Sequence, residues 1–158
     1  MKPILFALVL LAAGSSVSTA GADERFPPIT NKTVLQECGD CHMAFQPQFL
    51  PKRSWVKMMA GLSDHFGEDA SLDVAQVKEI EAYLTANAAD VSRFREGRKM
   101  LRRVDSKWTP LRISELPRFR HEHDDRDVKR MLDRLKVKTM AACQACHRGA
   151  TQGYFDDD

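Results

Sequence analysis

Apolar residues recur at helical spacing in three stretches of the chain. Residues 51–62 predict a helix that begins at Ser54 as N-cap, with an apolar face at i, i+3, i+4 and i+7 formed by Trp55, Met58, Met59 and Leu62. After the loop "SDHFGEDA", Ser71 is placed to cap a longer helix with apolar positions at Leu72, Val77, Ile80, Tyr83 and Leu84. Asp124 or Asp125 can cap the third, which carries Val128, Met131, Leu132 and Leu135.

Shorter elements fill the remaining sequence. Thr30 or Asn31 can cap a short helix that carries Val34, Leu35 and the segment "CGDCH", and a basic helix is expected near 89–104. The stretch 106–125 contains two prolines and Trp108, which predicts an irregular loop, and a last short helix is expected over 143–147. No segment alternates as a strand would, so the pattern predicts an all-α fold.

The first residues have the plan of a secretory signal peptide. Lys2 precedes an apolar run over 3–13 and a stretch of small residues, with cleavage expected after Ala20 or Ala22. The apolar run is too short to span a bilayer. We therefore expect a leader over 1–22, export to the periplasm as a soluble protein, and 158 − 22 = 136 remaining residues. That length suits one compact domain or two very small ones.

All four cysteines belong to two copies of one motif. "CGDCH" supplies Cys38, Cys41 and His42, and "CQACH" supplies Cys143, Cys146 and His147. Zinc or a redox dithiol would use the Cys-x-x-Cys pairs but would leave the following histidines unexplained. Covalent haem attachment uses every residue, because the two sulfurs bond the porphyrin and the adjacent histidine binds the iron. The motifs predict two covalently bound haem c groups.

Three further histidines are candidates for the second axial position of each iron. His65 lies in the loop before the Ser71 helix and is the candidate for the first haem, because that loop offers no methionine and Met58 and Met59 belong to the apolar face of the preceding helix. His121 and His123 compete for the second haem. They lie about 200° apart if helical and on one face if extended, so the spacing does not choose between them.

The ending "EIEAYLTANA" resembles the last helix of a class I cytochrome c. Residues 23–90 thus resemble a small class I cytochrome c-like unit around the first haem. The second half lacks that pattern, and we expect residues 91–158 to form an irregular helical unit around the second haem.

Three segments together resemble the dihaem cytochrome c family of periplasmic electron carriers in proteobacteria: 38–73, which contains "HFGEDASL"; "ISELPRFRHEH"; and "KVKTMAACQACHRGATQGYFDDD". The resemblance implies that two histidines hold each iron, His42 with His65 and His147 with one of the later pair. Family spacing of six residues after a proline favours His123, counted from Pro117, with His121 as the alternative. It also implies a membrane cytochrome b or quinol-linked donor and a soluble haem-protein acceptor.

We therefore expect an electron relay rather than an enzyme, with only transient contacts to its partners and the membrane surface. The alternative is a dihaem enzyme of peroxidase type with one open iron, for which His121 or Glu122 would be the base. Nucleic acid is not an expected partner, because the chain is exported and its 24 basic residues nearly balance 22 acidic ones.

Overall fold

Helices and short turns make up the fold, which we describe from a computed structural model over residues 25–155. The predicted leader, residues 1–22, lies outside the described residues. The α-helices are α1 Lys32–Glu37, α2 Lys52–Met59, α3 Val74–Ala86, α4 Arg95–Met100, α5 Pro117–His123 and α6 Arg126–Leu135. Single 3-10 turns occur at Pro47–Phe49, Leu62–Asp64, Ile113–Glu115, Cys143–Ala145 and Ala150–Gln152. Over this range only isolated bridges occur in place of strands, which confirms the all-α prediction.

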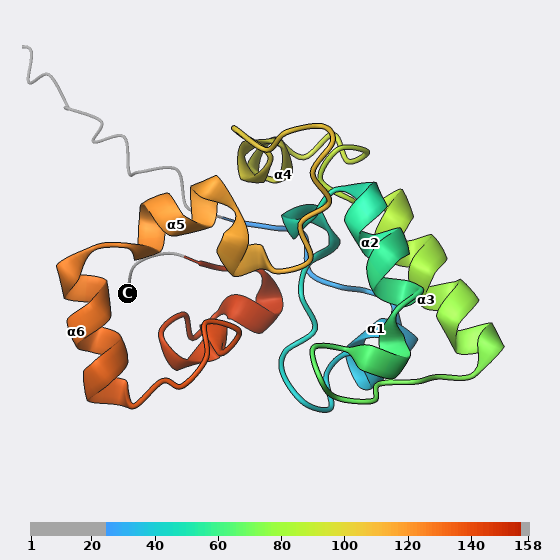
Figure 1. Cartoon of the computed structure of the whole chain (residues 1–158), viewed down its shortest axis with the longest axis horizontal. Coiled ribbons are helices and arrows are strands. Elements are labelled where there is room, and N and C mark those ends of the chain that lie inside the picture. The colour runs from blue at the N-terminus through green and yellow to red at the C-terminus, as the bar shows by residue number, and fades with distance from the viewer. Residues whose placement is uncertain (1–24, 156–158) are drawn as a thin grey trace, which may run out of the picture.

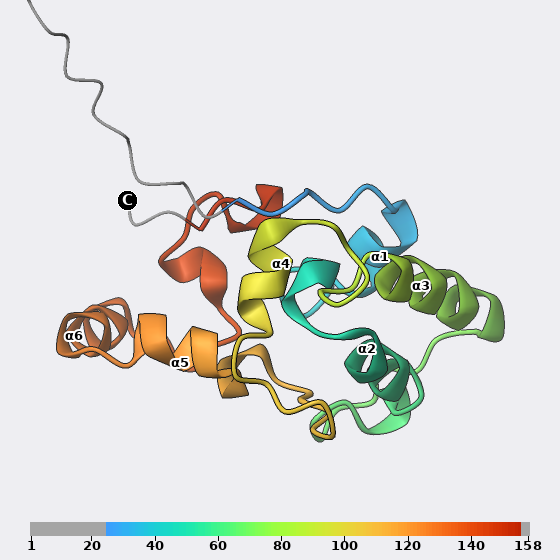
Figure 2. The ribbon, with the colours of Figure 1, turned by 90° about the horizontal axis from the view of Figure 1, so that it is seen from above.

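The helices form two groups with α4 between them. Helices α1, α2 and α3 lie together, and α5 and α6 lie on the other side of the molecule (Figure 1). The view from above places α4 between these groups (Figure 2). The segment after α6 returns past α5 toward the beginning of the described chain, where the Phe26 N–H donates to the Gly153 carbonyl at 2.8 Å.

Helix α1 begins as the sequence predicts, and α2 begins earlier. The Asn31 side chain accepts from the Val34 N–H at 2.8 Å and caps α1. Ser54 was the wrong cap for α2, because the helix starts at Lys52 and Ser54 is buried inside it. The Lys52 N–H instead donates to the Asp90 carboxylate at 2.7 Å. A partner 38 residues away satisfies this helix end, so no local cap signal was available.

The longest helix, α3, is capped two residues later than predicted. Asp73 accepts from the Gln76 N–H at 2.8 Å, and the Gln76 side chain accepts from the Asp73 N–H at 3.3 Å, which completes a capping box. Ser71 was therefore the wrong cap. The predicted apolar face is confirmed, since Ile80 and Leu84 are buried and the rest of that face packs partly buried against the core.

The second half contains a helix that the sequence analysis assigned to a loop. Pro117 starts α5 at a first-turn position, where proline has no N–H to satisfy and its φ suits a helix. Leu116, just before it, is fully buried. The basic helix is shorter than expected, because only Arg95–Met100 is helical. Asp125 rather than Asp124 caps α6, with its side chain accepting from the Asp127 and Val128 N–H groups.

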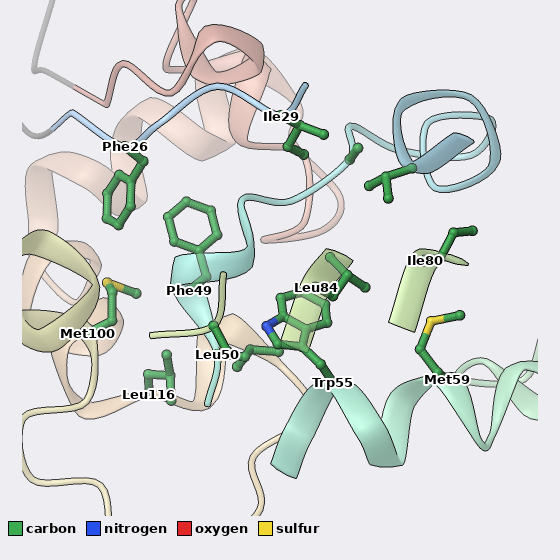
Figure 3. Close-up of a cluster of buried hydrophobic side chains, with 13 residues drawn as sticks. Phe26, Ile29, Phe49, Leu50, Trp55, Met59, Ile80, Leu84, Met100 and Leu116 are labelled. Carbon is green, nitrogen blue, oxygen red and sulfur yellow. The ribbon is translucent and has the colours of Figure 1, made fainter. Parts of the chain in front are cut away.

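One hydrophobic cluster includes residues from both sides of position 90. Figure 3 shows that this cluster extends from Trp55, Met59, Ile80 and Leu84 to Phe26 and Phe49. From these two rings it continues to Met100 and Leu116. The buried Gln46 side chain adds a polar link by donating to the Ala150 carbonyl at 2.9 Å. The division into units at 23–90 and 91–158 stays a prediction, but the described core joins the two segments.

None of the helices within residues 25–155 is both long and apolar enough to cross a membrane.

Loss of the capping box has a measurable cost. We expect Asp73→Ala to lower the free energy of unfolding by about 1 kcal/mol, because it leaves a first-turn N–H of α3 without its side-chain acceptor. Denaturant unfolding followed by far-UV circular dichroism measures this change. Ser71→Ala is the control and should change stability by less than about 0.5 kcal/mol. Equal losses in the two variants would contradict the assignment of Asp73 as the cap.

Candidate haem-binding sites

The first Cys-x-x-Cys-His motif forms the turn that follows α1. Cys38 is the C-cap of α1, so the motif begins where the helix ends rather than lying on it as predicted. A Cβ at Gly39 would lie 2.2 Å from the Leu35 carbonyl oxygen, so this turn requires glycine. Burial, with the charge of Glu37, raises the pKa of the Cys38 thiol to about 11, and Cys41 is exposed. The two sulfurs therefore lie in different environments.

The His42 ring is oriented by its neighbours. Its Nδ1 lies 2.7 Å from the Met43 carbonyl oxygen, and because a carbonyl only accepts, Nδ1 carries the proton. The Phe45 ring stacks on the imidazole with centroids 4.7 Å apart. In the neutral imidazole the hydrogen bond to the Met43 carbonyl puts the proton on Nδ1 and the free lone pair on Nε2, the atom that can bind a metal.

His65 is held in the loop between α2 and α3. Its backbone makes a two-way bridge with Glu68, with hydrogen bonds of 2.7 and 3.3 Å. Partial burial, followed by the nearby His42 and Arg112, lowers the pKa of His65. The imidazole is therefore neutral at pH 7 and can act as a metal ligand.

The ring centres of His42 and His65 lie at the separation expected of two ligands on one iron. Their centroids are 6.2 Å apart and their planes make an angle of 32°. Metal–nitrogen bonds of about 2.0 Å on both sides of one ion would suit two imidazole rings at this separation. The geometry fits an iron between them.

The second motif forms a single 3-10 turn, Cys143–Ala145, followed by Cys146 and His147. The His147 and Cys146 N–H groups both donate to the Cys143 carbonyl, at 2.8 and 3.2 Å, which fixes the turn. The predicted helix is therefore only one turn long. Burial raises the pKa of the Cys143 thiol to about 11. Cys146 is half-buried.

Helix α5 separates the two competing histidines. His123 is half-buried, its Nδ1 lies 2.9 Å from the Phe119 carbonyl oxygen, and its ring stacks on Phe119 with centroids 3.9 Å apart. His121 lies about 200° around the helix and is exposed. The His123 and His147 centroids are 6.0 Å apart, with a plane angle of 73°. The structure thus brings His123, and not His121, opposite His147.

The surroundings of His123 leave room for a large apolar group. A cavity of about 320 Å³ borders His123 and is also lined by Ser114, Phe119, Arg120, Asp124 and Met140. Helix α6 has a predicted apolar face, yet Val128, Met131 and Leu132 are only half-buried and Leu135 is 45% exposed. In Figure 1, α6 lies across from the segment that carries the second motif. A porphyrin between them would cover apolar surface that the protein leaves uncovered.

Zinc and disulfide alternatives have no support in the geometry. No group of three or more histidine, cysteine or acidic side chains converges on a metal position within residues 25–155. All four cysteines are unpaired thiols. The two motifs therefore do not meet at one tetrahedral ion.

The match to a family model decides between these interpretations. The model of dihaem cytochrome c matches residues 34–155, which is most of the chain. This chain belongs to the dihaem cytochrome c family. A search of curated proteins gives no match.

Solved structures of the family are similar in sequence and in fold. A diheme cytochrome c from Rhodobacter sphaeroides is 49% identical, with a TM-score of 0.75, and the match covers 82% of this chain and 100% of that one. A crystal structure of DHC purified from Rhodobacter sphaeroides is 46% identical, with a TM-score of 0.64, and the match covers 81% of this chain and 99% of that one. A diheme cytochrome type c from Shewanella baltica OS155 is 34% identical, with a TM-score of 0.63, and the match covers 80% of this chain and 87% of that one.

Membership confirms two of the predictions made from the motifs. The protein binds two covalently attached haem c groups, and its family supports a role as an electron carrier with redox protein partners. The sequence analysis missed the aromatic residues that contact the histidine rings, Phe45, Phe119 and Phe155. Phe45 lies three positions after His42, and Phe119 lies four positions before His123, so both could have been found from the sequence. Phe155 is brought to His147 only by the fold.

Removal of the second haem should loosen α6 selectively. In the double variant Cys143→Ala, Cys146→Ala we expect amide hydrogen exchange across Arg126–Leu135 to rise at least tenfold, because the described residues cover that apolar face only in part. Helix α3 is the internal control, since protein side chains bury its Ile80 and Leu84. Unchanged protection of α6 would show that it packs without the haem.

Proposed function

We propose that this dihaem cytochrome c relays single electrons in the periplasm, with His42 and His65 binding one iron and His123 and His147 binding the other. The observation that supports this most directly is the pair of imidazole separations, 6.2 and 6.0 Å. When bound, the haem iron supplies reversible one-electron chemistry, and two imidazoles on it leave no position open for oxygen or peroxide.

The hydrogen bonds to His42 and His123 support the same role. The Met43 and Phe119 carbonyls fix the Nδ1 protons and keep each Nε2 available, so these ligands stay in place whichever charge the iron carries. A site that does not rearrange on reduction suits fast electron exchange. Histidine in place of methionine as the second ligand also favours a low reduction potential, hence a reducing carrier.

The proposed donor is a membrane cytochrome b or quinol-linked complex, and the proposed acceptor is a soluble haem protein. The predicted leader supports export, and family membership supports redox protein partners in general. Contacts with such partners would be small and transient.

A dihaem enzyme of peroxidase type has weaker support. It needs an open iron with a base beside it. Of the two candidate bases, His121 is exposed and Glu122 makes an ion pair of 3.0 Å with Arg118 along the same helix. Within the part of the chain that the structure describes, neither candidate makes a contact that would hold it over an iron.

Carbon monoxide binding to the reduced holoprotein tests whether histidines occupy both axial positions of each iron. We expect the unchanged protein to bind none, and His123→Ala to bind one equivalent while both haems stay attached, as checked by the pyridine haemochrome spectrum. His121→Ala is the matched control, two residues away on the same helix, and should bind none. Binding by His121→Ala but not by His123→Ala would contradict the ligand assignment.

Membrane vesicles from the native bacterium test the proposed donor. Quinol added to these vesicles should reduce the purified oxidised protein, followed by its α-band absorbance, at a rate at least ten times that of quinol alone. Equal rates with and without vesicles would contradict a membrane-linked donor and leave the ligand assignment intact.

A further inference from the structure

The imidazole of His147 contacts an aromatic ring near the end of the described chain. The Phe155 and His147 centroids are 5.6 Å apart with their planes at 61°, an edge-to-face contact. Phe155 belongs to the "GYFDDD" ending, a segment that the ligand assignment does not use. Its role is therefore open to argument from its contacts.

Phe155 is held in place by the main core. Its ring packs edge-to-face on Phe49 at 5.2 Å and on Phe26 at 5.7 Å, and these two rings contact each other at 4.7 Å. Phe26 and Phe49 are only 6% and 5% exposed. A ring fixed on two sides by buried rings cannot turn freely, so it presents a constant surface to His147.

The backbone beside Phe155 is fixed as well. The Phe26 N–H donates to the Gly153 carbonyl at 2.8 Å, and Arg25 pairs with Tyr154 in an isolated bridge. Gly153 has φ of +87°, and a Cβ there would lie 2.1 Å from the Phe26 carbonyl oxygen, so the two segments approach closely only because this residue is glycine. Figure 2 shows the beginning of the described chain running beside its last part.

His123, the other proposed ligand of the second iron, is held by contacts within α5. The His123 plane lies within 3° of the Phe119 plane, and its Nδ1 hydrogen bond to the Phe119 carbonyl fixes the same orientation. The ring of His123 is thus held by groups of α5, whereas the ring of His147 contacts Phe155. The angle of 73° between the planes of these two rings contrasts with 32° between His42 and His65.

We propose that Phe155 is a positioning residue that holds the His147 plane nearly perpendicular to the His123 plane, and so gives the second haem an electronic structure different from that of the first. The proposal rests on the histidine assignment made under the proposed function. Ligand planes that cross leave two iron d orbitals nearly equal in energy, whereas nearly parallel planes split them. The first case gives a strongly anisotropic low-spin ferric signal and the second a rhombic one.

Electron paramagnetic resonance of the oxidised holoprotein tests this proposal. We expect two low-spin signals in the unchanged protein, one strongly anisotropic and one rhombic. In Phe155→Leu, which keeps apolar volume in the core but removes the ring, the strongly anisotropic signal should shift toward lower anisotropy while the rhombic signal stays in place. The separate variant Phe155→Tyr keeps an aromatic ring at this position and should give the same signals as the unchanged protein.

Phe94→Leu is the matched control. Phe94 contacts Phe26 at 6.2 Å in the same aromatic cluster, and the substitution is the same. It should leave both signals unchanged. An unshifted signal in Phe155→Leu, an equal shift in Phe94→Leu, or two rhombic signals in the unchanged protein would overturn the role of Phe155. A high-spin signal in the unchanged protein would instead contradict the histidine assignment on which the proposal rests.

Discussion

The separation of about 6 Å within each imidazole pair is the constraint on which the rest of the structure depends. His42 and His65 come from separate loops, and His123 and His147 from a helix and a single turn, so each pair must be brought together by the elements around it. Packing of α2 on α3 fixes the position of the intervening loop with His65. On the other side, α5 presents His123, and the turn at Cys143–Ala145 presents His147.

The two sites are supported in different ways. Around the first haem, buried side chains such as Trp55, Ile80 and Leu84 form a core without help from the cofactor. Around the second, α6 has no buried residue, and a porphyrin beside it would cover the apolar face that the protein leaves partly exposed. Phe155 and Gln46 join the second site to that core, through His147 and the Ala150 carbonyl. These two contacts tie the segment of the second motif to the core beside the first.

The sequence predicts what depends on local periodicity and on covalent chemistry. The sequence predicts the apolar faces of α2 and α3, a cap of α1 at Thr30 or Asn31, and the haem motifs, because each depends on a few neighbouring residues. It does not predict the start of α2, since Asp90 satisfies it from far along the chain. Helix α5 does not follow from the sequence pattern, because proline commonly interrupts a helix, whereas Pro117 stands in the first turn of this one. The choice of His123 over His121 depends on that helix, which the spacing alone does not give.

The central claim is that both irons are held by two histidines, and near-infrared magnetic circular dichroism of the oxidised holoprotein measures this most directly. The energy of the charge-transfer band of a low-spin ferric haem depends on its two axial ligands. We expect bands of bis-imidazole type with the intensity of two haems. A band of histidine–methionine type, or high-spin bands from one haem in the intact protein, would contradict it.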